Sequence, residues 1–245
     1  MNEIKRLLSF ARRAIDDYQM IEDGDKIAVG ISGGKDSLSL LATMAALRRF
    51  YPLRFDLCAI TVDMGFEGAD FSAIADFSSS LGVPFRAVKT EIAEIIFNVR
   101  KEPNPCSLCA KMRRGVLHST AKEMGCNRVA LGHHFDDVVE TFMLNLFFEG
   151  RLGSFSPVTY LSNADLYLIR PLIYAQEKDV SYFVRHNELP IMTSLCPEDK
   201  HTEREKMKEL LRKLERDYPG LRHRLFGALT RAELDGYRST GKLPL

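Results

Sequence analysis

The 245-residue sequence lacks a long apolar run. No stretch approaches the roughly 20 consecutive apolar residues that would span a bilayer. The first 20 residues carry charges throughout and lack the apolar core of a signal peptide. We therefore expect a cytoplasmic protein that does not associate with membranes.

Cysteine is scarce and odd in number, with Cys58, Cys106, Cys109, Cys126 and Cys196 only. An odd count with one close Cys-x-x-Cys pair is unlike the disulfide framework of a secreted protein. In a cytosolic chain the same pattern indicates metal or redox chemistry. Cys58 falls within a predicted strand and Cys126 ends a predicted helix, so we interpret both as buried packing residues.

The sequence also has no strong charge of either sign, since its formal net charge is +1. Composition therefore gives no argument for nucleic acid, and any RNA binding must depend on local basic clusters. Repeats and low-complexity tracts are absent. The length fits one large α/β domain, alone or with a small appendage, and such a chain buries roughly 70–75% of its unfolded surface without disulfides.

Short apolar runs alternate with helical patterns along the chain. Strands are predicted at residues 26–31, 55–62, 85–88, 128–131 and 166–169, and helices at residues 1–20, 38–50, 69–81, 106–124, 136–148 and 176–187. This alternation predicts an α/β fold with a parallel sheet and helices on both faces, in which ligands bind at the carboxyl ends of the strands.

The chain divides into three predicted parts. Residues 1–22 form an N-terminal helix, and residues 23–196 form the main α/β domain, which includes the Cys-x-x-Cys helix. The charged segment 197–245 is interpreted as a small helical C-terminal appendage.

The strongest motif is a glycine-rich turn between the first predicted strand and the next helix. It consists of Ser32, Gly33, Gly34, Lys35, Asp36 and Ser37. The two glycines permit backbone angles that turn amides toward an anion, and the helix presents its positive end to the same place. The lysine adds charge and the serines add hydroxyl donors. The aspartate would repel phosphate unless a magnesium ion lies between them.

This hexapeptide differs from the other common nucleotide-binding loops. Val29 stands where a P-loop has its first glycine, and Asp36 stands where it has its final Ser or Thr. The hexapeptide matches the PP-loop signature of ATP pyrophosphatases, which cleave ATP between the α and β phosphates. The alternative is a chance glycine-rich turn, but the strand, the loop and the helix all agree with the motif.

A second cluster, GHHFDD at residues 132–137, follows the fourth predicted strand. Asp136 and Asp137 either cap the next helix, or one of them helps Asp36 to hold magnesium on the pyrophosphate. We favour the metal role and assign it to Asp137, with Gly132 beside the nucleotide. Asp63 ends the second predicted strand at the same edge of the sheet, and it either lines the nucleotide pocket or caps the next element.

Cys106 and Cys109 begin a predicted helix, a position that lowers the thiol pKa and favours the thiolate. Together with Cys196, in a loop flanked by prolines, they could bind an iron–sulfur cluster or zinc. Three thiolates would leave one iron of a four-iron cluster open to sulfide. The alternatives are a structural zinc that also uses a histidine such as His201, and a thioredoxin-like redox pair.

Local basic residues offer two candidate RNA contacts. Lys111, Arg113 and Arg114 follow the cysteines on one predicted helix, where Arg113 or Arg114 is the better candidate for a phosphate contact. A second set, interleaved with glutamates, comprises Arg204, Lys206, Lys208, Arg212, Lys213 and Arg216. That set is equally consistent with a solvated helix held by ion pairs.

Four segments together resemble the tRNA 2-thiocytidine synthetases, a family of PP-loop ATP pyrophosphatases. They are MIEDGDKIAVGISGGKDS at 20–37, PCSLCAKMRRG at 105–115, GHHFDD at 132–137 and RPL at 170–172. The likeness runs from about residue 15 to about residue 226, and the combination is far more specific than the phosphate loop alone.

The resemblance implies an adenine nucleotide alpha hydrolase-like fold and an ATP- and Mg²⁺-dependent enzyme. It implies an oxygen-sensitive 4Fe-4S cluster on Cys106, Cys109 and Cys196. The implied substrate is a cytidine at tRNA position 32, and the implied sulfur source is a cysteine desulfurase or another sulfide donor. We also expect a homodimer. The expected catalytic residues are Lys35, Asp36, Arg113 and Asp137.

The expected reaction is adenylation of the base carbonyl oxygen with release of pyrophosphate, followed by attack of sulfur and departure of AMP. Two other functions stay open. One is another PP-loop tRNA-modifying or amide-forming ligase with a structural zinc. The other is a nucleotide-binding redox sensor without enzymatic activity.

Overall fold

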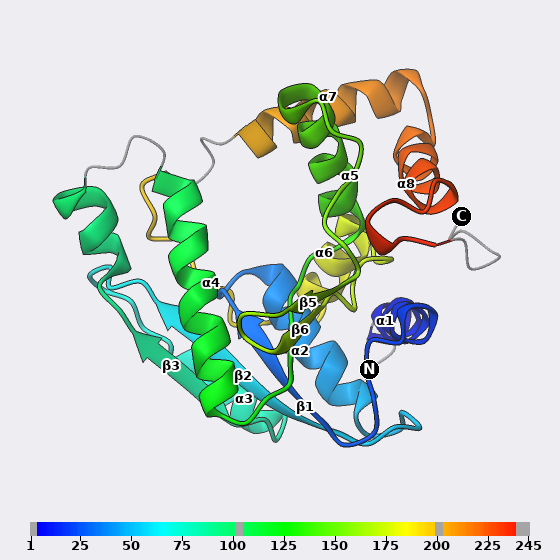
Figure 1. Cartoon of the computed structure of the whole chain (residues 1–245). Helices are drawn as coiled ribbons and strands as arrows, with labels where there is room; N and C mark the ends of the chain where they lie inside the picture. The colour runs from blue at the N-terminus through cyan, green and yellow to red at the C-terminus, as the bar shows by residue number, and fades with distance from the viewer. Residues whose placement is uncertain (1–3, 101–104, 199–202, 239–245) are drawn as a thin grey trace.

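The computed structural model describes residues 4–100, 105–198 and 203–238 (Figure 1). Its centre is one six-stranded sheet in the order β3-β2-β1-β4-β6-β5. The strands are β1 (Asp25–Ile31), β2 (Phe55–Asp63), β3 (Phe85–Lys89), β4 (Arg128–Ala130), β5 (Val158–Leu161) and β6 (Leu166–Ile169). All neighbours pair in parallel except β5 and β6.

Eight α-helices surround the sheet within the described ranges. They are α1 (Ile4–Tyr18), α2 (Lys35–Leu47), α3 (Ser72–Ser80), α4 (Pro105–Glu123), α5 (Phe135–Leu144), α6 (Glu177–Arg185), α7 (Glu203–Asp217) and α8 (Leu221–Arg231). Two π-helical turns, η1 (Glu94–Val99) and η2 (Asn145–Glu149), and the 3₁₀ turn η3 (Leu234–Gly236) complete the fold. Figure 1 shows α4 crossing one side of the sheet, and α5, α7 and α8 gathered together. None of the described helices combines the length and apolar character needed to cross a membrane.

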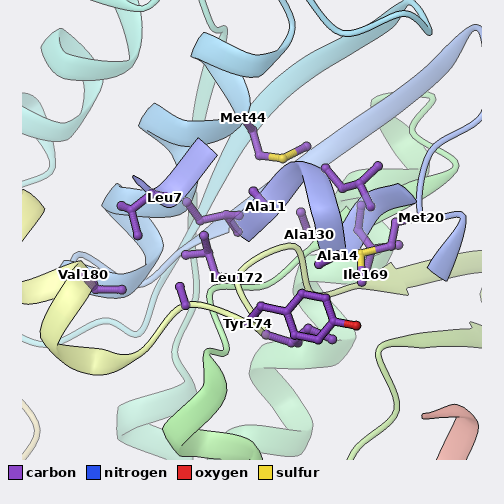
Figure 2. Close-up of a cluster of buried hydrophobic side chains, with 14 of the residues drawn as sticks. Leu7, Ala11, Ala14, Met20, Met44, Ala130, Ile169, Leu172, Tyr174 and Val180 are labelled. Carbon is purple, nitrogen blue, oxygen red and sulfur yellow. The ribbon is translucent and has the colours of Figure 1, made fainter. Parts of the chain in front are cut away.

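The core lies on both faces of the sheet because alternate residues of each central strand point in opposite directions. Ile27 and Val29 of β1 join the larger cluster, which α1, α2, α5 and α6 cover. Ala28, between them, joins the smaller cluster beneath Leu117 of α4. Figure 2 shows part of the larger cluster, where Leu7 and Ala11 of α1 lie near Met44 of α2 and Leu172. Burial on both faces explains why these strands read as continuous apolar runs.

The predicted α/β class, with a parallel sheet covered by helices on both faces, is confirmed. Sequence reasoning missed the edge strand β5, which is antiparallel to β6 and only half-buried. The helix predicted at residues 136–148 ends as an α-helix at Leu144 and continues as the π-helical turn η2. One difference lies in the outermost strand of the sheet and the other at the end of a helix, where the periodicity of apolar residues predicts little.

The C-terminal helices pack against the domain that precedes them. Met207 and Leu211 of α7 and Phe226 and Leu229 of α8 belong to the larger core cluster. The proposed boundaries at 22/23 and 196/197 stay predictions, although side chains from both flanking segments share one core.

Candidate active site

The glycine-rich loop connects β1 to α2 at the point where the strand order reverses. β2 and β3 lie on one side of β1, and β4 lies on the other. In open α/β sheets this switch point, at the carboxyl ends of the strands, is where ligands bind. The structure therefore places the predicted phosphate loop where its chemistry requires it.

The loop is held in shape by its two serines. The Ser37 hydroxyl donates to the carbonyl of Gly34 at 3.0 Å and accepts the Ser32 amide at 3.1 Å. The Ser32 hydroxyl accepts the Gly34 amide at 3.3 Å. These bonds fold residues 32–37 into a compact turn that leads directly into α2, whose N-cap is Gly34.

Two glycines are required by geometry here. Gly33 has a φ of +81°, a left-handed conformation that favours glycine. Gly132 lies so close to the loop that a Cβ would stand 2.9 Å from the carbonyl carbon of Asp36. Gly132, predicted to lie beside the nucleotide, therefore lets the end of β4 approach the loop backbone.

Lys35 and Asp36 begin α2 and pair with each other. The Lys35 Nζ lies 2.8 Å from Asp36 Oδ1 and 3.2 Å from Glu177 Oε1 of α6. Burial would lower the pKa of Lys35, but the two carboxylates outweigh it and raise that pKa. Lys35 thus carries a stable positive charge within the loop.

The second cluster converges on His134, which is buried between two carboxylates. Its Nε2 lies 3.6 Å from Asp36 Oδ1, and its Nδ1 lies 3.5 Å from Asp137 Oδ2. The His134 amide also donates to Asp137 Oδ2 at 2.9 Å, so Asp137 caps α5. Burial alone would raise the pKa of Asp137, but His134, His133 and Arg204 help to lower it, and the group stays a carboxylate.

Asp136 differs from its neighbour because structural partners occupy both of its oxygens. Arg222 of α8 donates to Oδ1, and the amide of Glu177 donates to Oδ2 at 2.7 Å. Asp136 therefore joins α5 to α6 and α8. The other two members of the predicted magnesium set, Asp36 and Asp137, lie beside His134 at the phosphate loop. Their metal role stays a prediction.

One cavity of about 330 Å³ brings the phosphate loop and the cysteines together. Ser32 and Gly34 of the loop and Asp63 at the end of β2 form part of its wall. Cys106, Cys109 and Arg113 of α4 line the wall from a different element, and Cys196 lines it from the segment that follows Met192. Asp63 also accepts the amide of Gly65 at 2.9 Å, so it both lines the pocket and fixes the next turn.

The three cysteines line this cavity without enclosing a closed site. Within the described ranges, no three His, Cys, Asp or Glu side chains are placed to hold one metal ion. His201, the candidate fourth ligand of zinc, lies outside the described residues. The site fits an iron–sulfur cluster by its chemistry, because it offers three free thiols from two segments on the wall of one cavity.

The expectation that the helix start lowers the thiol pKa is wrong. The pKa of Cys106 is raised by burial and then by Cys196 and Glu198. The pKa of Cys109 is also raised by burial, although nearby Arg113 opposes the change. Burial, together with the neighbouring thiols, therefore raises the pKa of both cysteines.

Cys58 and Cys126 are buried away from this cavity, on the sheet face that α4 covers. Their sulfur atoms lie 3.4 Å apart and share a hydrogen bond. This placement fits the predicted packing role.

Comparison with known proteins identifies the family. Residues 6–214 match the model of the PP-loop domain. The chain is 42% identical over 228 residues to the tRNA-cytidine(32) 2-sulfurtransferase of Syntrophotalea carbinolica, covering 92% of this chain and 88% of that protein. It is also 42% identical to the protein of that name from Ralstonia pickettii, covering 91% of this chain and 72% of the relative.

This chain belongs to the tRNA-cytidine(32) 2-sulfurtransferase family of PP-loop enzymes. The resemblance drawn from its four motifs is confirmed. A solved structure is also similar: the U34-tRNA thiolase NcsA from Methanococcus maripaludis with its [4Fe-4S] cluster. It matches with a TM-score of 0.77 and 26% identity, covering 94% of this chain and 78% of that one.

As a PP-loop enzyme the protein uses ATP. The structure also brings residues to this site that the sequence analysis does not assign to it. His134 was visible in the GHHFDD motif, but the motif alone gave it no partner. No sequence motif marks Glu177 or Arg222 as a site residue, because only folding brings α6 and α8 to the start of α5. Arg204 and Lys208 belong to the basic set that the sequence offers for RNA binding, but both turn toward α5 and α6.

Arg170 of the RPL motif has a structural role. It is buried, donates to the Ser156 carbonyl at 2.5 Å, and lies 4.9 Å from the ring centre of Phe155. The motif therefore secures the connection between β5 and η2 to the end of β6.

Proposed function

We propose that this protein is an ATP-dependent tRNA sulfurtransferase that converts cytidine 32 to 2-thiocytidine. The observation that carries the proposal is the single cavity lined by the phosphate loop, three cysteines and Arg113. A base bound there would meet both the activating nucleotide and the source of sulfur. The names of the relatives supply the base and its position.

Activation is the first step that the site is built to support. The base carbonyl oxygen attacks the α phosphate of ATP, an O–P bond forms, and pyrophosphate leaves. The amides of the loop, the positive end of α2 and Lys35 bind the phosphates and stabilise the charge that accumulates on the leaving group. The step is needed because a ring carbonyl oxygen is a poor leaving group and AMP is a good one.

Sulfur transfer completes the exchange without any change of oxidation state. A sulfide sulfur attacks the activated carbon, the C–O bond breaks, and AMP leaves with the original oxygen. Arg113 lines the cavity next to Cys109 and would neutralise the negative charge of the intermediate or of AMP. Its assignment as a catalytic residue is part of this proposal.

Cys106, Cys109 and Cys196 would hold the 4Fe-4S cluster. Three thiols from two segments are the donor set that such a cluster uses when one iron is left for another ligand. When bound, the cluster would supply a place for the incoming sulfide. The similar NcsA structure, which carries a [4Fe-4S] cluster, supports this assignment.

Asp36 and Asp137 would hold Mg²⁺ on the pyrophosphate. They lie on either side of His134, and hard oxygen ligands are what this ion prefers. We also propose that the enzyme acts in the cytoplasm as a homodimer. Its sulfur would come from a cysteine desulfurase or another sulfide source.

The cluster and the reaction can be tested together. Anaerobically purified protein should be brown with about four irons per chain. Changing Cys106, Cys109 or Cys196 to Ala should abolish the colour and the 2-thiocytidine measured by mass spectrometry of tRNA nucleosides. Cys58→Ala and Cys126→Ala are the matched controls and should keep both.

One zinc and no iron after strictly anaerobic preparation would reject the sulfur-transfer mechanism. The function would then revert to a PP-loop ligase with a structural zinc. Normal 2-thiocytidine levels in a strain without this gene would reject the base assignment.

A further inference from the structure

The basic residues of α7 fall on two faces of the helix. Lys206, Arg212, Lys213 and Arg216 are exposed to solvent. Arg204 and Lys208 lie on the other side with the buried Met207 and Leu211, which pack into the core. The spacing of one helical turn between Arg204 and Lys208 puts both cations on the face that meets α5 and α6.

Lys208 shares a carboxylate with the lysine of the phosphate loop. Its Nζ lies 3.6 Å from Glu177 Oε1, and Lys35 Nζ lies 3.2 Å from the same oxygen. Two ammonium groups therefore form ion pairs with one carboxylate oxygen. Lys208 is the less exposed of the two, with 18% of its side chain accessible against 30% for Lys35.

Arg204 reaches the same region one turn earlier. Its Nη1 lies 3.7 Å from Asp137 Oδ1 and 3.4 Å from Glu140 Oε2, and its Nη2 donates to Thr141 Oγ1 at 3.1 Å. Arg204 thus holds α7 against α5 and fixes the orientation of the helix that carries Lys208.

We propose that Lys208 is a binding residue for the pyrophosphate end of ATP, and that Glu177 takes the place of the phosphate when no nucleotide is bound. The inference deepens the proposed function, since it rests on the use of ATP, but it needs neither the base nor the sulfur source. Arg204 is a positioning residue that keeps Lys208 beside the loop.

Charge balance supports this assignment. The triphosphate carries several negative charges, whereas Lys35 is the one cation within the loop and is already paired with Asp36. A second lysine held at the same oxygen supplies the missing charge. Glu177 is 30% exposed at its side chain and can release its two lysines to a bound anion, because it holds them through contacts of 3.2 Å or longer.

The test is titration calorimetry of the purified chain with magnesium pyrophosphate and, separately, with AMP. Lys208→Met should weaken pyrophosphate binding about tenfold, which corresponds to about 1.4 kcal/mol for one lost charged hydrogen bond, and should leave AMP binding unchanged. Lys178→Met removes an exposed lysine next to Glu177 and serves as the matched control, with no effect on either ligand. Lys208→Arg should restore most of the affinity.

Glu177→Gln separates this role from a purely structural one. If Glu177 competes with phosphate for the two lysines, its neutralisation should tighten pyrophosphate binding. Unchanged pyrophosphate binding by Lys208→Met would overturn the proposal, as would an equal loss of pyrophosphate and AMP binding with a lowered Tm. Because these titrations need no tRNA or cluster, a failure of the thiolation assay alone would reject the proposed function and leave this inference intact.

Discussion

The amino ends and the carboxyl ends of the strands form two opposite edges of the sheet, here called the amino edge and the carboxyl edge. Both carry charged side chains, but they hold them in different ways. At the amino edge, Arg128 of β4 and Asp25 of β1 form a buried ion pair in which each side chain is 3% exposed. Asn127 donates to the second oxygen of Asp25 at 2.7 Å, and Glu22 lies 3.0 Å from Arg128. At the carboxyl edge, Lys35 and Glu177 are each 30% exposed, and one Glu177 oxygen serves two lysines.

The difference distinguishes a structural charge from an exchangeable one. A buried pair with every partner in place joins two strands and has no room for a ligand. A partly exposed carboxylate that holds two cations can release them to an anion of higher charge. The predicted ATP site lies at the edge where the ionic contacts are exposed to solvent.

The largest effect on stability is expected at the amino edge. Arg128→Met should lower the free energy of unfolding by about 3–5 kcal/mol, because it leaves the carboxylate of Asp25 buried without its partner. Urea unfolding measures the change. The affinity of the folded fraction for magnesium pyrophosphate should stay at the wild-type value, and a loss of affinity would break the proposed contrast between the edges.

Removing a charge at the carboxyl edge should lower activity and leave the stability of the fold nearly unchanged. Lys35→Ala and Asp36→Ala should each reduce pyrophosphate release about 10²–10³-fold, the cost of about 3–4 kcal/mol that one lost electrostatic contact has in a transition state. The urea midpoint should change little, because both side chains are about one third exposed. Near wild-type turnover in either variant would reject the phosphate-loop assignment.

Glu140 gives a prediction that depends on pH. This side chain is fully buried beside Arg204, and burial, followed by the charge of Asp137, raises its pKa from 4.5 to about 7. Asp136 raises the pKa further, and Lys208 and Arg204 oppose the change. Since folding favours the protonated acid, its contribution to stability is full below pH 4.5 and is lost as the pH rises toward 7.

Glu140→Gln should remove this dependence and raise the free energy of unfolding above pH 7 by up to about 3 kcal/mol. Urea unfolding at pH 5 and pH 8 measures it, with the exposed Glu67→Gln as the control. Equal pH dependence in wild type and Glu140→Gln would show that Glu140 is ionised in the folded protein at neutral pH.

The smallest effect is expected where the two motifs touch. Gly132→Ala places a Cβ 2.9 Å from the backbone of Asp36, so the loop must shift. We expect a KM for ATP about tenfold higher, which is a loss of about 1.4 kcal/mol in binding, and a free energy of unfolding lower by about 1–2 kcal/mol. Gly115→Ala is the matched control, since nothing lies within 4 Å of its Cβ.

Sequence alone determined the class of fold and predicted most of the candidate site. The strands at the centre of the sheet are buried on both faces, so their apolar runs identify them without tertiary information. The loop at residues 32–37 is a local structure whose glycines, lysine and serines act within one turn, and the motif therefore predicted its position. The three cysteines were selected by spacing and resemblance, and they line the cavity of that loop.

Tertiary structure alone decided which charges meet. The spacing of α7 gave Arg204 and Lys208 the same appearance as their exposed neighbours, and only packing against α5 and α6 turned those two inward. The same holds for Asp136, because only the tertiary structure brings Arg222 of α8 to pair with it. The physical reason is that an ion pair depends on distances of a few ångströms between segments far apart in the chain. Local patterns identify helices and loops but contain no such distance.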